Sequence, residues 1–200
     1  GQVCLAGTRL LVEESIRDEF LAKFHEHADA LVLGDSRDPA TQIAPMVHPD
    51  HRAAVHGFVE RARAAGDTIV RGGHPVGGSL HYQPTLIEPA SNESEVVQHE
   101  NFGPVLTFQT FTDEAEAIEL ANSTAYGLSA IVFTGSCERA ERVGRSIRAG
   151  LVWVNTFLVR DLTAPFGGCG ISGIGREGGD HALEFHSDLK TLMIADDTCS

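Results

Sequence analysis

The sequence predicts an α/β fold, in which a mostly parallel, open sheet carries helices on both of its faces. Short apolar runs alternate with amphipathic stretches along the chain, and this alternation is typical of strands that are joined by helices. The chain has 200 residues, of which 42% are hydrophobic, so it can bury a substantial core in one large or two small domains.

The first half of the chain contains strand and helix signals that are separated by glycine and proline. Pro49 opens one helix, and Gly34 and Gly66 end the two helical stretches of this half. We expect strands at residues 8–12, 68–70 and 82–87, helices that begin near residues 14 and 49, and loops at residues 34–45 and 72–79.

The alternation of strands and helices is clearer in the second half. The pattern predicts strands at residues 105–111, 128–133 and 151–155, with helices at residues 113–122 and 136–148 between them. Such a β-α-β-α-β order builds a mostly parallel sheet whose ligands bind beyond the carboxyl ends of the strands. The apolar residues Leu189, Leu192 and Ile194 predict a last strand at residues 187–196.

Charge and cysteine content argue against several classes of partner. With 15 Lys and Arg against 28 Asp and Glu, the net charge of −13 argues against nucleic acid and anionic membranes as partners, and no apolar run approaches the ~20 residues that span a bilayer. Four cysteines and ten histidines show no metal-ligand spacing, so we expect no metal and no disulfide framework. The cysteines are typical of free thiols in a cytoplasmic protein, and pairs such as His48 and His51 are interpreted as surface histidines.

Cys4 is the candidate nucleophile. A thiolate attacks a carbonyl carbon well, and the small neighbours Gly1, Ala6 and Gly7 would let a substrate and backbone N–H donors approach the sulfur. The alternative, favoured by this stretch alone, is a small buried hydrophobic residue between Val3 and Leu5.

Three further stretches have an ordinary structural interpretation when each is taken alone. Residues 99–104 and 155–168 place polar groups beside aromatic rings, as surface loops often do. Residues 168–173 and 173–178 both match the GxGxxG phosphate-binding pattern, but the strand, tight turn and helix that this pattern requires are missing around them. We interpret this run as a close-packed glycine turn.

Five ordered motifs together carry a resemblance that none of them carries alone. They are GQVCLAGTR, HENFGPV, NSTAYGLSA, GLVWVN, and PFGG followed by SGIGRE, and their order and spacing resemble the NAD(P)-dependent aldehyde dehydrogenase superfamily over essentially the whole chain. The resemblance implies a small-molecule aldehyde as substrate and NAD as cofactor, and leaves NADP open. It assigns the catalytic thiol to Cys4 and the nicotinamide ribose and ring contacts to Glu100 and Phe102. It places Val3, Leu5, Phe157 and Phe166 in the aldehyde tunnel.

The same resemblance predicts parts that lie upstream of residue 1. The family's general-base glutamate, its amide oxyanion donor and its nucleotide-binding domain precede the thiol, so we expect a fragment that cannot turn over aldehyde alone. Residues 1–186 would form the catalytic domain, and residues 187–200 an oligomerisation strand and tail of a homodimer or homotetramer. A lysine that is common after PFGG is replaced here by Cys169-Gly170, so its role is not transferred.

Within the family, residues 155–168 and the GIGREGG run most resemble dehydrogenases of carboxylated, muconic-type semialdehydes. Arg160 could hold such a carboxylate through two parallel hydrogen bonds, or could instead form a salt bridge with Asp161 or another acid of the loop. Three other functions stay open: a thiol acyltransferase or hydrolase, a CoA-acylating or phosphorylating relative, and a non-catalytic binding or assembly scaffold.

Overall fold

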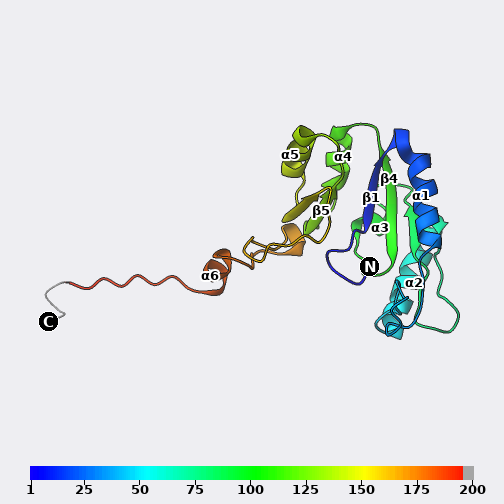
Figure 1. The fold of residues 1–200 in the computed structure, drawn as a ribbon, viewed down its shortest axis with the longest axis horizontal. Helices are drawn as coiled ribbons and strands as arrows, with labels where there is room; N and C mark the ends of the chain where they lie inside the picture. Colours follow the sequence, from blue (N-terminus) through cyan, green and yellow to red (C-terminus); the bar gives the residue numbers. More distant parts are fainter. Residues whose placement is uncertain (196–200) are drawn as a thin grey trace.

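The strands form two sheets in the computed structural model, which describes residues 1–195 (Figure 1). The larger sheet has the order β1-β4-β3-β2, and the smaller one pairs β5 with β6. Every pair is parallel except β2 with β3, so the predicted mostly parallel sheet is confirmed. The strands are β1 (Arg9–Glu13), β2 (Thr68–Arg71), β3 (Thr85–Glu88), β4 (Val105–Phe111), β5 (Ser129–Val132) and β6 (Leu151–Val154).

The second half differs from the single β-α-β-α-β sheet that the sequence predicts. The elements form close to the predicted positions, but β4 lies between β1 and β3 in the larger sheet, while β5 and β6 pair with each other. A strand has only two edges for hydrogen bonds. Because β1 and β3 occupy both edges of β4, β5 has no free edge of β4 to join.

Local signals explain where the longer helices begin. The His48 ring accepts a hydrogen bond from Asp50 N–H before Pro49, and the side chains of Asp113 and Ser136 cap two later helices in the same way. The helices are α1 (Arg17–Asp29), α2 (Pro49–Ala64), α3 (Glu95–Gln98), α4 (Glu114–Ala121), α5 (Cys137–Ser146) and α6 (His181–His186), with 3-10 turns at η1 (Glu14–Ile16) and η2 (Gly170–Ser172).

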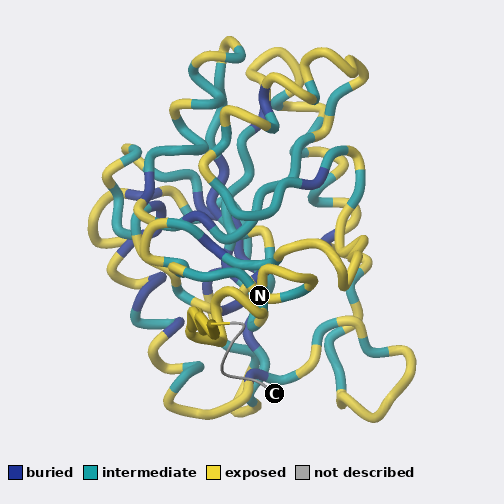
Figure 2. The backbone as a smooth tube through the Cα atoms, turned by 90° about the vertical axis from the view of Figure 1, so that its left-hand side faces the viewer, coloured by how far each residue is buried: buried dark blue, intermediate teal, exposed yellow. Residues whose placement is uncertain are grey.

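The core lies on both faces of the larger sheet, and adjacent residues of β3 show how it is divided. The Ile87 side chain joins the cluster formed with α2, which includes Val55 and Val59. The neighbouring Leu86 points to the other face and packs in the cluster that contains Phe108 of β4 and the aromatic residues of α1. Helices therefore cover both faces, as predicted, and the buried backbone gathers between them (Figure 2).

The predicted C-terminal strand is not formed in the described residues. Residues 187–195 have neither helix nor strand, and they extend away from the body of the molecule (Figure 1). Leu189 and Met193 are 98% and 90% exposed. A strand needs a neighbouring strand for its backbone groups, and none of the described strands pairs with residues 187–194. Asp196 lies outside the described residues. Among residues 1–195, no helix is long and apolar enough to cross a membrane.

Candidate active site

Cys4 is exposed in a short turn that is anchored on both sides. Ala6 N–H donates to the Val3 carbonyl at 2.9 Å and closes the turn around the thiol. On one side, Gln2 Oε1 accepts a hydrogen bond from Val47 N–H at 3.1 Å. On the other side, the Leu5 side chain is only 8% exposed and holds the loop to the protein body. The turn thus presents Cys4 to solvent, which contradicts the alternative of a buried hydrophobic cysteine.

The cysteine loop, residues 1–8, packs against loop 99–104. β1 and β4 are parallel neighbours, and Thr107 N–H donates to the Thr8 carbonyl where the two strands begin. A Cβ atom built on Gly1 would lie 2.0 Å from the carbonyl oxygen of Gly103, so only glycine allows this contact. The pairing of two parallel strands brings together the two loops that precede them.

The candidate site residues do not all lie at the same end of the strands. Cys4, Glu100 and Phe102 lie at the amino ends of β1 and β4, whereas the prediction placed ligands beyond the carboxyl ends. Phe157, Arg160 and Phe166 keep the predicted relation, because they follow the carboxyl end of β6. The rule that ligands bind beyond the carboxyl ends of strands concerns loops that follow a strand. The cysteine loop and loop 99–104 instead precede β1 and β4.

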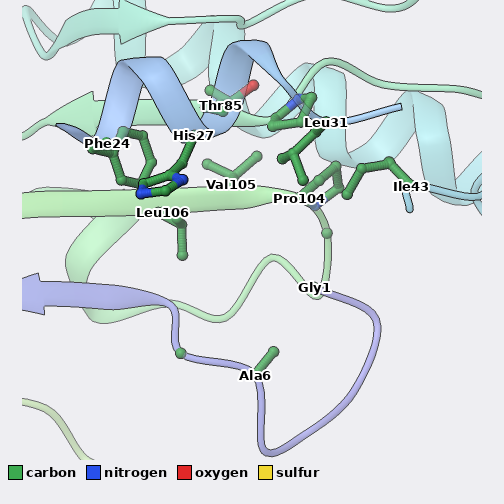
Figure 3. Close-up of a pocket in the computed structure, with 14 residues that line it drawn as sticks. Gly1, Ala6, Phe24, His27, Leu31, Ile43, Thr85, Pro104, Val105 and Leu106 are labelled. Carbon is green, nitrogen blue, oxygen red and sulfur yellow. The ribbon is translucent and has the colours of Figure 1, made fainter. Parts of the chain in front are cut away.

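An apolar cavity of about 300 Å³ lies next to the cysteine loop (Figure 3). Gly1 and Ala6 line it together with Phe24 and Leu31 of α1 and with Pro104 at the entrance to β4. Cys4 is not among the lining residues, so this cavity is not where the thiol would meet a substrate.

Glu100 and Phe102 are accessible and suit a nicotinamide riboside. The Glu100 side chain is exposed and forms no hydrogen bond or ion pair within residues 1–195, so both carboxylate oxygens can accept from ribose hydroxyls. Phe102 is 37% exposed and offers a ring face for stacking. Its φ of 54° is left-handed, a conformation that costs a non-glycine residue about 1–2 kcal/mol. Such strain is concentrated at functional sites.

Arg160 lies against an aromatic ring. Its guanidinium carbon is 4.7 Å from the centroid of the Phe166 ring, within the range of a cation–π contact. The alternative pairing with Asp161 is not formed. Asp161 Oδ1 instead accepts from the Thr163 hydroxyl at 2.7 Å and from its backbone N–H at 2.9 Å, and these hydrogen bonds lower the pKa of the carboxyl group. Within residues 1–195, Arg160 donates no hydrogen bond and joins no ion pair.

Trp153 holds the other aromatic residue of this loop. Its indole N–H donates to the Val159 carbonyl at 2.8 Å, and its ring contacts the Phe157 ring edge to face, with centroids 5.4 Å apart. Phe157 is 43% exposed. The sequence indicates only that Trp153 belongs to a strand motif. It does not predict that the Trp153 side chain supports this loop.

The glycine run behaves as the close-packed turn that the sequence predicts. A Cβ atom on Gly168 would lie 2.6 Å from the Ser172 Cβ atom. Ser172 Oγ accepts from Gly127 N–H at 3.0 Å, and Cys169 N–H donates to the Gly127 carbonyl at 2.9 Å. Tyr126, next to Gly127, in turn contacts Glu100, because its hydroxyl accepts from Glu100 N–H at 3.3 Å.

The structure therefore brings the predicted residues together in two groups. The first group is Cys4 with loop 99–104, and the second is Arg160 with Phe166. Val3 is 60% exposed beside Cys4, while Leu5 is buried and anchors the turn. No hydrogen bond or ring contact within residues 1–195 joins the two groups directly.

The fold and this arrangement of loops define a class, that of α/β catalytic domains with a cysteine-bearing loop. The chain belongs to the aldehyde dehydrogenase family, whose model matches residues 1–192. The 2-hydroxymuconic semialdehyde dehydrogenase of Pseudomonas putida is 42% identical over 201 residues, which cover 97% of this chain and 41% of that protein. A betaine aldehyde dehydrogenase of Sinorhizobium fredii is 40% identical over 198 residues, covering 97% and 41%. The chain thus spans about two fifths of the length of these relatives.

Solved structures show the same fold. HpcC from Thermus thermophilus superposes with a TM-score of 0.91 and 42% identity, over 96% of this chain and 39% of that one. The betaine aldehyde dehydrogenase of Staphylococcus aureus, solved in complex with NAD+, gives a TM-score of 0.88 and 38% identity, over 92% and 38%.

Proposed function

We propose that this chain is the thiol-bearing part of an enzyme that oxidises an aldehyde to the corresponding acid, with NAD as hydride acceptor. The observation that carries the proposal is the exposed Cys4, held in an anchored turn against loop 99–104. The NAD+ bound to the Staphylococcus aureus relative supports the choice of cofactor, and NADP stays open.

The first step needs only groups of this chain. The Cys4 thiolate, once its proton has passed to solvent, forms a C–S bond to the aldehyde carbon, and the C=O π electrons move to the oxygen. The Cys4 N–H makes no hydrogen bond within residues 1–195, and it would donate to this oxyanion. The tetrahedral adduct keeps the C–H bond rich in electrons, which is what hydride loss requires.

Oxidation and release follow from that adduct. As the C=O bond forms again, the C–H electron pair leaves with its hydrogen, and a thioester to Cys4 remains. The nicotinamide ring, when bound, accepts this hydride. Glu100 would hold the ribose hydroxyls and Phe102 would stack against the ring, so the two residues would set the hydride distance. Water then adds to the thioester carbon, its proton passes to a base or to solvent, and the Cys4 thiolate leaves, giving the acid.

Replacing Glu100 by Gln tests the cofactor role. Gln keeps the size of the side chain but removes the charge-assisted hydrogen bonds to the ribose, so hydride transfer should slow about 10-fold. In the complete enzyme, a deuterated aldehyde should then give a larger isotope effect on kcat than it gives with the unmodified enzyme. Glu93→Gln, which changes another exposed glutamate, is the control. An isotope effect that is unchanged or smaller would contradict this role for Glu100.

For the substrate, we propose a carboxylated semialdehyde. Arg160 contacts Phe166 and donates no hydrogen bond to any of residues 1–195, so a carboxylate could accept two of its N–H groups in parallel. The muconic-type relative supports this class. Arg160 would instead repel a betaine aldehyde, which carries a cationic ammonium group. Betaine aldehyde dehydrogenases are nevertheless almost as similar to this chain in sequence as the muconic-type relative.

We also propose that the extended C-terminal arm pairs with a second copy of the enzyme. Its apolar residues Leu189, Leu192 and Met193 are 98%, 75% and 90% exposed, so their burial would favour association. Residues 1–186 would then form the catalytic domain, and residues 187–200 the oligomerisation segment of a homodimer or homotetramer.

Cys4, Cys137 and Cys169 are free thiols, and this state fits the cytoplasmic location that we propose.

A further inference from the structure

Two side chains from other parts of the fold hold the backbone of loop 99–104. The Tyr126 hydroxyl, from the segment before β5, accepts a hydrogen bond from Glu100 N–H at 3.3 Å. His51 Nε2, in the first turn of α2, lies 2.9 Å from the Phe102 carbonyl oxygen. Because a carbonyl oxygen only accepts, His51 must carry the proton on Nε2 and donate it. Both contacts fall on residues that we assign to cofactor binding.

The loop needs this support because its conformation is strained. Phe102 has a φ of 54°, a left-handed value that a residue with a side chain rarely adopts. Asn101 Oδ1 accepts from Gly103 N–H at 2.7 Å and closes the turn from within. A Cβ atom on Gly103 would lie 2.8 Å from Val55 Cγ2, so α2 packs directly on the loop. The conformation is therefore fixed by several contacts at once, as strained residues require.

We propose that Tyr126 and His51 are positioning residues for the cofactor. Tyr126 fixes the backbone from which the Glu100 carboxylate extends, and His51 fixes the backbone at Phe102. Together they hold an acceptor for the ribose and a ring for the nicotinamide at a constant separation before the cofactor binds. This inference rests on the proposed function of Glu100 and Phe102, and neither Tyr126 nor His51 contacts the reacting atoms.

The test uses Tyr126→Phe and His51→Ala in the complete enzyme. Hydrogen exchange of the peptide that contains residues 99–104, measured by mass spectrometry without cofactor, should become faster in both variants, because each loses a contact that holds this loop. The dissociation constant for NAD, measured by quenching of protein fluorescence, should rise about 3- to 10-fold, as expected for the loss of one hydrogen bond. The KM for the aldehyde should change less than the NAD dissociation constant, since the hydrogen bonds that are removed go to Glu100 and Phe102 and not to the cysteine loop.

Matched variants separate positioning from general destabilisation. Tyr82→Phe removes the same hydroxyl from a buried tyrosine whose partner is His56, and His74→Gln alters a histidine that contacts the Gly72 carbonyl. Both should leave exchange at residues 99–104 and the NAD dissociation constant unchanged. His51→Gln keeps an N–H donor and should restore much of the effect of His51→Ala.

Exchange that is unchanged in both Tyr126→Phe and His51→Ala would overturn the proposal, and so would faster exchange with unaltered NAD binding. Failure of the proposed function is a different result, because an unmodified enzyme that does not bind NAD would still show the effect of these variants on exchange. If His51→Ala does not fold, the comparison of Tyr126→Phe with Tyr82→Phe still decides the outcome.

Discussion

Replacing Cys4 by Ser or Ala in the complete enzyme should lower aldehyde-dependent NADH formation at least about 10³-fold, because the covalent step has no substitute nucleophile. The other described cysteines are not equivalent. Cys137 begins α5, and Cys169 donates its S–H to the Gly127 carbonyl at 3.3 Å inside the glycine turn. A weaker nucleophile at position 4 would add to the aldehyde poorly and would leave less readily from the resulting ester.

Cys137→Ala is the matched control, since it removes an equally exposed thiol that no loop of the site contains. It should leave the rate unchanged. Labelling with iodoacetamide followed by peptide mapping gives an independent check, in which loss of activity should follow modification of Cys4. Inactivation that accompanies labelling of Cys137 or Cys169 while Cys4 stays unmodified would show that the thiol is assigned wrongly.

The periodicity of the sequence predicts the strands and helices of this fold well, but it does not predict which strands pair with one another. The strand predicted at residues 105–111 forms β4 with the same bounds, because a short apolar run leaves a local signal in the sequence. The partners of β4 depend on segments about 20 and 100 residues away, and no local pattern records which edge each of them takes. The prediction therefore had the right strands in a sheet with the wrong order.

The same limit applies to the site. Cys4, Glu100 and Phe102 could be named because they belong to motifs, whereas the contacts that hold them could not. The NSTAYGLSA motif contains Tyr126 without indicating that its hydroxyl meets the backbone of a residue 26 positions earlier. His51 was interpreted as a surface histidine, and its bond to the Phe102 carbonyl again leaves no trace in composition or spacing.

Adjacent opposite charges were also a poor guide at Arg160. A pair with Asp161 was the alternative to carboxylate binding, but the Asp161 carboxylate accepts its hydrogen bonds from Thr163 instead. Thr163 lies two residues further along the chain. Asp side chains often stabilise turns in this way. In the described part of the chain, Arg160 makes an aromatic contact with the face of its guanidinium and donates no hydrogen bond.

Arg160→Ala should therefore reduce kcat/KM for a carboxylated semialdehyde, such as 2-hydroxymuconic semialdehyde, by roughly 30-fold, or about 2 kcal/mol. This is the lower end of the range for removing one partner of a charge pair, because Arg160 is exposed in the chain described here and water weakens the interaction. A neutral aldehyde of similar length should lose much less. The measurement is kcat/KM for both substrates in the complete enzyme.

Two further variants show which property of Arg160 matters. Arg160→Lys keeps the positive charge but loses the planar fork, so it should recover only part of the preference for the carboxylated substrate. Arg145→Ala removes an exposed arginine that pairs with Glu141 on α5, and it should leave the ratio of the two substrates unchanged. Equal losses on both aldehydes in Arg160→Ala would mean that Arg160 only braces its loop against Phe166. The main reason for preferring the carboxylated substrate would then be removed, and a neutral aliphatic or aromatic aldehyde would become the better choice.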